Sequence, residues 1–213
     1  MADAKSVMLG RIREAMAAAP PAAVSVPREY DRAPLQGAAD VARFAETVGE
    51  YRAQVHRVTA TEISATVAGL VPPGGRVVVP GDLPPEWVRD VIAVVDERSR
   101  EEHGTDEPAL SNADLDQVDA VVTGCALGIA ATGTIVLDAG VAQGRRALTL
   151  IPDHHICVVF ADQVVDTVPQ AFAALDPSRP LTFVSGPSAT SDIELNRVEG
   201  VHGPRTLDVL IVT

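Results

Sequence analysis

The chain has 213 residues, of which 46% are hydrophobic and 22% charged, and this balance is typical of a globular protein with one sizeable core. The formal net charge of −12 argues against a surface that neutralises the phosphates of nucleic acids or of anionic lipids. We therefore expect neither a nucleic acid nor a membrane as a partner.

The first predicted element is a helical arm. Met8, Ile12 and Met16 follow one another at four-residue steps, which predicts an amphipathic helix over residues 4–19. Prolines between positions 20 and 34 then predict an extended linker. We expect an arm over residues 1–37, docked on its own domain or on a partner, and one α/β domain over residues 38–213.

Helices and strands alternate in the first half of this domain. Asp40 is a candidate N-cap for a helix that extends to Gln54. The elements predicted next are a strand at 56–58, a helix at 61–70, a strand at 76–80, a short helix at 84–89, and strands at 91–95 and 118–123. Such alternation predicts a parallel sheet that is covered on both faces.

The second half of the domain begins differently. Residues 128–138, 147–151 and 156–160 are β-rich runs without a helix between them, which predicts antiparallel pairing. A helix at 164–175, a buried strand at 181–184 and a last strand at 207–212 follow. The predicted fold class is α/β, as a three-layer α/β/α domain with a mixed sheet.

The stretch from Leu181 to Pro204 is a candidate ligand site. Its strand ends in the turn Ser185-Gly186-Pro187-Ser188, and the pair Ser191 and Glu194 has the spacing of a capping box, with Asp192 in the first turn of the predicted helix. The amino end of a helix attracts anions and phosphorylated ligands. In the alternative interpretation, Ser188, Thr190 and Ser191 only cap the helix.

Other residues are candidates for binding or for proton transfer. In Thr132-Gly133-Thr134, a glycine allows close approach and two hydroxyls can bind a carboxylate or phosphate, although a β-bulge explains the pattern equally. His154 and His155 are expected to point to opposite faces of a strand. His202, beside Gly203, can donate a proton or cap backbone groups.

No complete catalytic motif is present. Ser188 lacks the G-x-S-x-G pattern of a nucleophile elbow, and Glu194 can act as a nucleophile or as part of the capping box. The histidines lack a spacing such as H-x-x-x-H, so we predict no metal site. The catalytic candidates are Glu194 and His202.

Lysine and cysteine usage excludes several cofactors. Lys5 is the only lysine, which excludes a P-loop lysine and a Schiff base in the core. Cys125 and Cys157 lack C-x-x-C spacing, so they cannot by themselves hold an iron–sulfur cluster, and we expect buried free thiols in the cytoplasm. The sequence contains no run of 18 consecutive apolar residues, so we expect no membrane span. The identity of a cofactor stays open.

Four motifs together resemble the lactate-utilisation protein C family, which carries the LUD domain. They are Thr132-Gly133-Thr134-Ile135-Val136-Leu137, Pro152-Asp153-His154-His155-Ile156, Ser185 through Glu194 (SGPSATSDIE) and Gly200-Val201-His202-Gly203-Pro204. The resemblance implies the fold of ribose-5-phosphate isomerase, glucosamine-6-phosphate deaminase and CoA transferases. It also implies a role in oxidising L-lactate to pyruvate, with iron–sulfur proteins as partners.

The first functional hypothesis is a component of a lactate-oxidising system that binds a small anionic ligand between the loops at Thr132 and Ser185. The expected binding residues are Thr132, Gly133, Thr134, His155, Ser185, Gly186, Ser188, Thr190, Ser191, Asp192, His202 and Gly203. The alternatives are an independent enzyme that acts on a CoA-linked or phosphorylated metabolite and a structural adaptor without a ligand. The sequence leaves open whether the chain is an enzyme.

Overall fold

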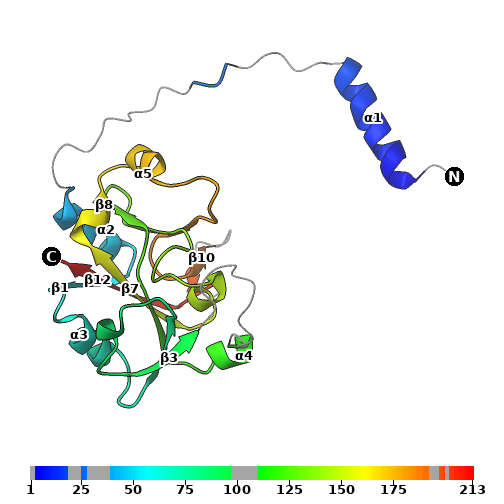
Figure 1. Ribbon diagram of the computed structural model, residues 1–213. Helices are drawn as coiled ribbons and strands as arrows, with labels where there is room; N and C mark the ends of the chain where they lie inside the picture. Colours follow the sequence, from blue (N-terminus) through cyan, green and yellow to red (C-terminus); the bar gives the residue numbers. More distant parts are fainter. Residues whose placement is uncertain (1–2, 19–24, 28–38, 97–109, 192–196, 200–201) are drawn as a thin grey trace. The chain divides into compact units, whose positions relative to one another are not determined.

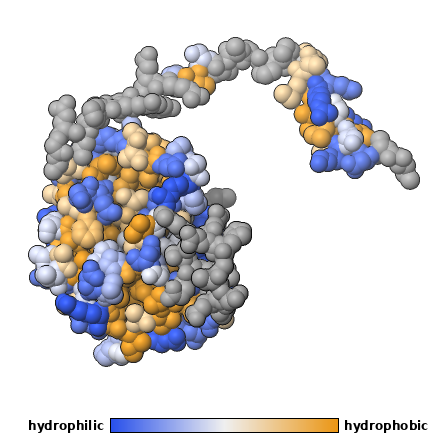
Figure 2. All heavy atoms as spheres, viewed as in Figure 1, coloured by the Kyte–Doolittle hydropathy of each residue, from blue (hydrophilic) through white to orange (hydrophobic). Residues whose placement is uncertain are grey.

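The computed structural model describes residues 3–18, 25–27, 39–96, 110–191, 197–199 and 202–213 (Figure 1). The chain divides into two compact units, Met1–Asp31 and Arg32–Thr213. The first unit contains α1 (Ala4–Ala18), which confirms the predicted helix. Met8, Ile12 and Met16 are exposed on it, and apolar and polar side chains share its surface (Figure 2).

The core of the second unit is a six-stranded sheet with the order β1-β12-β7-β4-β2-β3 (Figure 1). Every neighbouring pair is parallel, which confirms the parallel sheet predicted from the alternating elements. The strands are β1 (Gln54–Val58), β2 (Arg76–Pro80), β3 (Ile92–Asp96), β4 (Ala120–Thr123), β7 (His154–Phe160) and β12 (Thr206–Val212). Their valine and isoleucine runs suit a sheet whose two faces are both covered.

A second, four-stranded sheet has the order β8-β5-β6-β9. Its strands are β5 (Leu127–Ile129), β6 (Thr134–Leu137), β8 (Val164–Val165) and β9 (Thr182–Val184). β6 pairs antiparallel with β5 and with β9, whereas β5 and β8 are parallel, so the run predicted at 128–138 is divided into two strands that pair with each other. The prediction that the strand at 181–184 is buried is wrong, because β9 is an edge strand and Phe183 is 43% exposed.

Two predictions between β6 and β7 are also wrong. Residues 147–151 do not form a strand, because Arg146–Thr149 form the 3-10 helix η2. β7 does not pair antiparallel with the strands before it but lies parallel to β4 and β12. β4 and β7 are joined by residues 124–153, a connection long enough for the crossover that parallel pairing requires.

Different elements cover the two faces of the parallel sheet. The remaining helices are α2 (Val41–Glu50), α3 (Ile63–Leu70), η1 (Pro85–Trp87), α4 (Asn112–Leu115), η3 (Ala161–Gln163) and α5 (Val168–Ala174). α3 and η1 pack on one face. α2 and β6 pack on the other face, and α5 packs on the outer side of the second sheet. The α/β class is thus confirmed, but a second sheet replaces part of one layer of the predicted α/β/α arrangement.

The start of α2 confirms the predicted N-cap. The Asp40 side chain accepts a hydrogen bond from the Arg43 backbone N–H at 2.8 Å, and this bond satisfies one free donor of the first turn. The Asp40 backbone N–H itself donates to Asp166 Oδ1 at 2.9 Å. Asp166 follows β8, so this bond ties α2 to the second sheet.

The helix predicted to begin at Ser191 falls on residues 192–196, which lie outside the described residues. Ala189–Ser191 form β10, which pairs antiparallel with β11 (Arg197–Glu199). Asp192 and Glu194 lie outside the described residues. The attraction of an anion to the amino end of a helix at this loop stays a prediction.

Asp208 on β12 links two histidines from the neighbouring strands. Its carboxylate oxygens lie 2.6 Å from His56 Nε2 and 2.7 Å from His154 Nε2, and its side chain is almost fully buried. Burial raises the pKa of Asp208, but the hydrogen bonds from His154 and His56 outweigh that effect and hold the pKa below its usual value. The ionised carboxylate therefore stabilises the fold.

We expect Asp208→Asn to be less stable than the wild type at pH 7 by about 1 to 3 kcal/mol. The contribution of the carboxylate is fully present above its unfolded pKa of about 3.9, and it is lost as the pH falls through the lower folded value. Urea unfolding over a pH series measures both effects. If acid lowered the free energy of unfolding of Asp208→Asn as much as that of the wild type, this role would be contradicted.

Candidate functional site

Two loops that are far apart in sequence meet at the edge between β6 and β9. Thr134 Oγ1 lies 2.8 Å from Ser185 Oγ and 2.8 Å from Thr132 Oγ1. The contact follows from strand pairing, because Ile135 lies opposite Val184 in the antiparallel ladder. The loops at Thr132 and Ser185 are therefore adjacent, and the sequence predicts them as the two sides of a ligand site.

A cavity of about 320 Å³ opens beside Ser185. Its polar lining includes Ser185, Ser188, His155, His202 and Arg146, and it lies near the amino ends of β7 and β12. No aspartate or glutamate is among its lining residues in the described part of the chain. The whole chain has a formal net charge of −12, so the lining of this cavity is much less acidic than the average surface.

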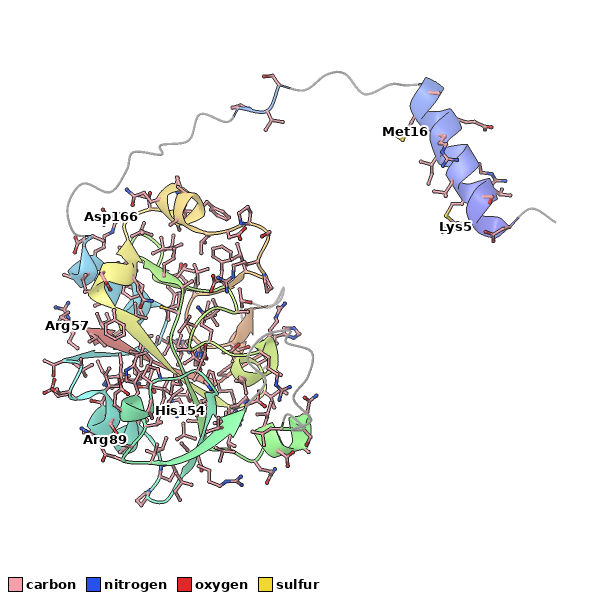
Figure 3. The ribbon with its side chains drawn as sticks, viewed as in Figure 1. Lys5, Met16, Arg57, Arg89, His154 and Asp166 are labelled. Atoms are coloured by element: carbon pink, nitrogen blue, oxygen red, sulfur yellow. The ribbon has the colours of Figure 1, made fainter. Side chains whose placement is uncertain are left out.

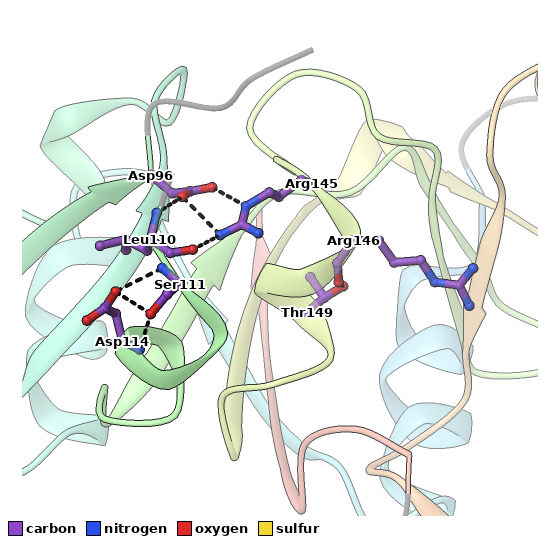
Figure 4. Close-up of polar contacts among 7 residues, drawn as sticks. All are labelled: Asp96, Leu110, Ser111, Asp114, Arg145, Arg146 and Thr149. Carbon is purple, nitrogen blue, oxygen red and sulfur yellow. Dashed lines mark hydrogen bonds and ion pairs between the residues drawn. The ribbon is translucent and has the colours of Figure 1, made fainter. Parts of the chain in front are cut away.

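Arg146 is the cationic group of this cavity, and the sequence analysis missed it. Arg145 and Arg146 follow each other at the start of η2, so their side chains point in different directions (Figure 4). Arg145 donates to Asp96 and to the Leu110 carbonyl, whereas Arg146 extends away from that network and lines the cavity. An arginine pair in an acidic chain is the sequence signal that could have identified it.

His155 supplies a buried imidazole to the cavity. Only 2% of the residue is exposed, and its Nε2 lies 2.8 Å from Thr123 Oγ1 on β4. The neighbouring His154 points to the other face of β7, where it meets Asp208 (Figure 3). This confirms the prediction that the two histidines face opposite sides of the strand.

The turn that begins at Ser185 is held by the segment before β12. The His202 backbone N–H donates to Ser188 Oγ at 3.1 Å, and the Ser188 backbone N–H donates to the Pro204 carbonyl at 2.8 Å. These bonds place the exposed imidazole of His202 and the backbone of Gly203 beside the cavity. The motifs around Ser188 and His202, 14 residues apart, thus form one side of the same cavity.

Two of the predicted binding glycines are required by packing. Gly133 has a φ of +56°, and a Cβ atom there would lie 2.6 Å from the Thr47 carbonyl group of α2. A Cβ atom on Gly186, which has a φ of +77°, would overlap the Tyr51 carbonyl oxygen just after α2. Both loops therefore need glycine because α2 lies against them.

The structure does not bring all predicted residues into the cavity. Thr132, Gly133 and Thr134 support the loop of Ser185 but do not line the cavity. Thr190 and Ser191 belong to β10, and their side chains lie outside what the structure describes. The same holds for Asp192 and for the catalytic candidate Glu194.

The described part of the chain contains no group of three or more histidine, cysteine, aspartate or glutamate side chains arranged to hold a metal ion. In that same part, every helix is too short or too polar for a transmembrane span. Cys125 and Cys157 are both buried and free, as predicted.

Comparison with known proteins identifies the family. Residues 41–212 match the family model of the LUD domain. A lactate utilization protein C from Deinococcus radiodurans is 46% identical over 99% of this chain and 96% of its own length. A lactate utilization protein C from Geobacillus kaustophilus is 33% identical over 66% of this chain and 63% of its own length.

One solved structure is similar over most of the fold. It is a crystal structure of a DUF162 family protein from Deinococcus radiodurans, with a TM-score of 0.66 and 40% sequence identity. The similarity covers 81% of this chain and 96% of that chain. These matches confirm the resemblance inferred from the four motifs, and the chain therefore belongs to the LUD domain family.

Proposed function

We propose that this protein is a component of a system that oxidises L-lactate to pyruvate and that it binds a small carboxylate anion in the cavity beside Ser185. The names of its relatives support a role in lactate utilisation. The observation that best supports anion binding is the lining of the cavity. It combines Arg146, two histidines and several hydroxyls, and it has no carboxylate among its described residues.

The chemistry of the lining fits a 2-hydroxy or 2-oxo acid. The guanidinium of Arg146 can pair with a carboxylate, and the hydroxyls of Ser185 and Ser188 can bind the oxygen on the neighbouring carbon. A volume of about 320 Å³ lies at the small end of the range for ligand pockets. His202 is exposed at the rim, where it can exchange a proton with solvent.

The oxidation itself requires an electron acceptor. The two free cysteines of this chain lie in the core and lack the spacing that binds an iron–sulfur cluster. We propose that iron–sulfur proteins of the same system carry the electrons and that these proteins act together in the cytoplasm. We also propose that the domain shares the fold of ribose-5-phosphate isomerase, glucosamine-6-phosphate deaminase and the CoA transferases.

Reconstitution of the system with its iron–sulfur partners tests this function. We expect lactate-dependent electron transfer to fall when this chain is left out and to recover when it is added back. Arg146→Gln should restore much less activity than the wild type, whereas Arg89→Gln should restore it fully, because Arg89 is exposed and outside the cavity. Unchanged electron transfer without the chain would refute the proposal.

A further inference from the structure

A second and larger cleft lies at the opposite end of the parallel sheet. Its volume is about 700 Å³, and it is bordered by Trp87 after β2, by Gly124 and Cys125 after β4, and by Phe160 at the end of β7. The chain leaves β2 to form β3 on one side and returns to form β4 on the other side. Parallel sheets characteristically bind ligands at the carboxyl ends of the strands at such a reversal.

The walls of this cleft suit a flat ring. The rings of Trp87 and Phe160 have centroids 5.8 Å apart, and both residues line the cleft together with apolar side chains from β5 and α5. The loop after β6 closes another side. In this loop Ala139 and Ala142 have positive φ values of 54° and 58°, a conformation that is costly for alanine and is characteristic of constrained functional loops.

The charges of the cleft are opposite to those of the cavity beside Ser185. Arg179 is the cationic group among its lining residues, and it is already paired with the buried Asp138 at 2.9 Å. Asp162 and Asp176 add two exposed carboxylates. The excess of negative charge disfavours a phosphate or carboxylate inside the cleft and favours a ligand that donates hydrogen bonds.

We propose that this cleft binds an uncharged planar heteroaromatic compound with hydrogen-bond donors, the chemistry shared by a nucleoside and by the ring system of a flavin. The ring packs against Trp87 and Phe160, and its donors reach the carboxylate of Asp162. The proposal is independent of the anion site, because the two cavities share no lining residue.

Trp87 makes the test direct, because it is the only tryptophan of the chain and lines the cleft. Adenosine and riboflavin serve as probes in titrations of the tryptophan fluorescence of the full chain, with equilibrium dialysis as a second measure. We expect at least one of them to bind saturably, with a Kd below about 1 mM. AMP and FMN should bind at least about tenfold more weakly than their unphosphorylated forms. No saturable binding of either adenosine or riboflavin would overturn the proposal.

A matched pair of variants locates the binding. Ala174→Phe places a ring in the cleft from an exposed position on α5, and it should weaken binding at least about tenfold. Ala173→Phe, at the neighbouring exposed position outside the cleft, should bind as the wild type does. Asp162→Asn should reduce the difference in affinity between adenosine and AMP, because it removes one negative charge from the cleft. Equal binding by Ala174→Phe and the wild type would overturn the assignment to this cleft.

Discussion

Replacing Asp96 by alanine is expected to lower the free energy of unfolding by about 3 to 5 kcal/mol. The side chain of Asp96 is fully buried at the end of β3, where it accepts hydrogen bonds from Arg145 Nε at 2.8 Å and from the Leu110 backbone N–H at 3.1 Å (Figure 4). Its removal leaves the half-buried guanidinium of Arg145 without its carboxylate. For a chain of 213 residues, the expected fall in Tm is on the order of 10 °C.

Three further variants, which are Arg145→Met, its combination with Asp96→Ala, and Asp96→Asn, separate the charge pair from the packing. Arg145→Met together with Asp96→Ala should cost less than the sum of the two single changes, because no unpaired charge remains. Asp96→Asn keeps an acceptor for the Leu110 backbone N–H and should cost less than the alanine change. Urea unfolding of the wild type, Asp96→Ala, Arg145→Met and the double variant measures the coupling. Strictly additive losses would show that the pair does not anchor the edge strand β3.

The second large effect is expected from Gly133→Ala, at about 2 to 5 kcal/mol of lost stability. An alanine at the φ of +56° is strained, and its Cβ would lie 2.6 Å from the Thr47 carbonyl carbon and oxygen. The helix α2 would have to move away from the second sheet to make room. Thermal or urea unfolding without any ligand measures the loss.

Gly49 in α2 provides the matched control. A Cβ atom there meets nothing within 4 Å, so Gly49→Ala should be neutral or stabilise by up to about 1 kcal/mol through its helix propensity. The pair also separates the two interpretations of the Thr132-Gly133-Thr134 motif. A Gly133→Ala protein that keeps its stability and loses only ligand binding would contradict the packing role.

Periodicity and breakers were sufficient to predict much of the fold. The strands at Arg76–Pro80 and Thr206–Val212 are nearly continuous apolar runs, and such runs occur in sheets buried on both faces. The second sheet was not predicted as a separate layer. Its strands span two to four residues, too few for a period to be measured.

The site was predicted where its signal was local and missed where it depends on tertiary contacts. The turn at Ser185, the histidine at 155 and the turn at His202 were selected from their composition, and they do meet at one cavity. Arg146 was missed because the sequence does not show in which direction a side chain of η2 points. In the structure, Arg145 and Arg146 are neighbours and point in different directions.

The cleft at the carboxyl ends of β4 and β7 left no sequence motif. Its residues come from several separate segments, including Trp87, Gln143 and Arg179, and none of them forms a recognised spacing. Only the strand order, with β4 and β3 on either side of β2, reveals that these segments meet.

The central claim is that a small carboxylate anion binds beside Ser185, and a thermal-shift titration with L-lactate and pyruvate tests it most directly. A ligand at about ten times its Kd should stabilise the native state by about 1.4 kcal/mol, which raises the Tm by about 3 to 6 °C. The uncharged analogue lactamide should give no shift. Arg146→Gln should abolish the shift and Arg89→Gln should retain it. No shift with either acid, or an equal shift for Arg146→Gln and the wild type, would contradict the account.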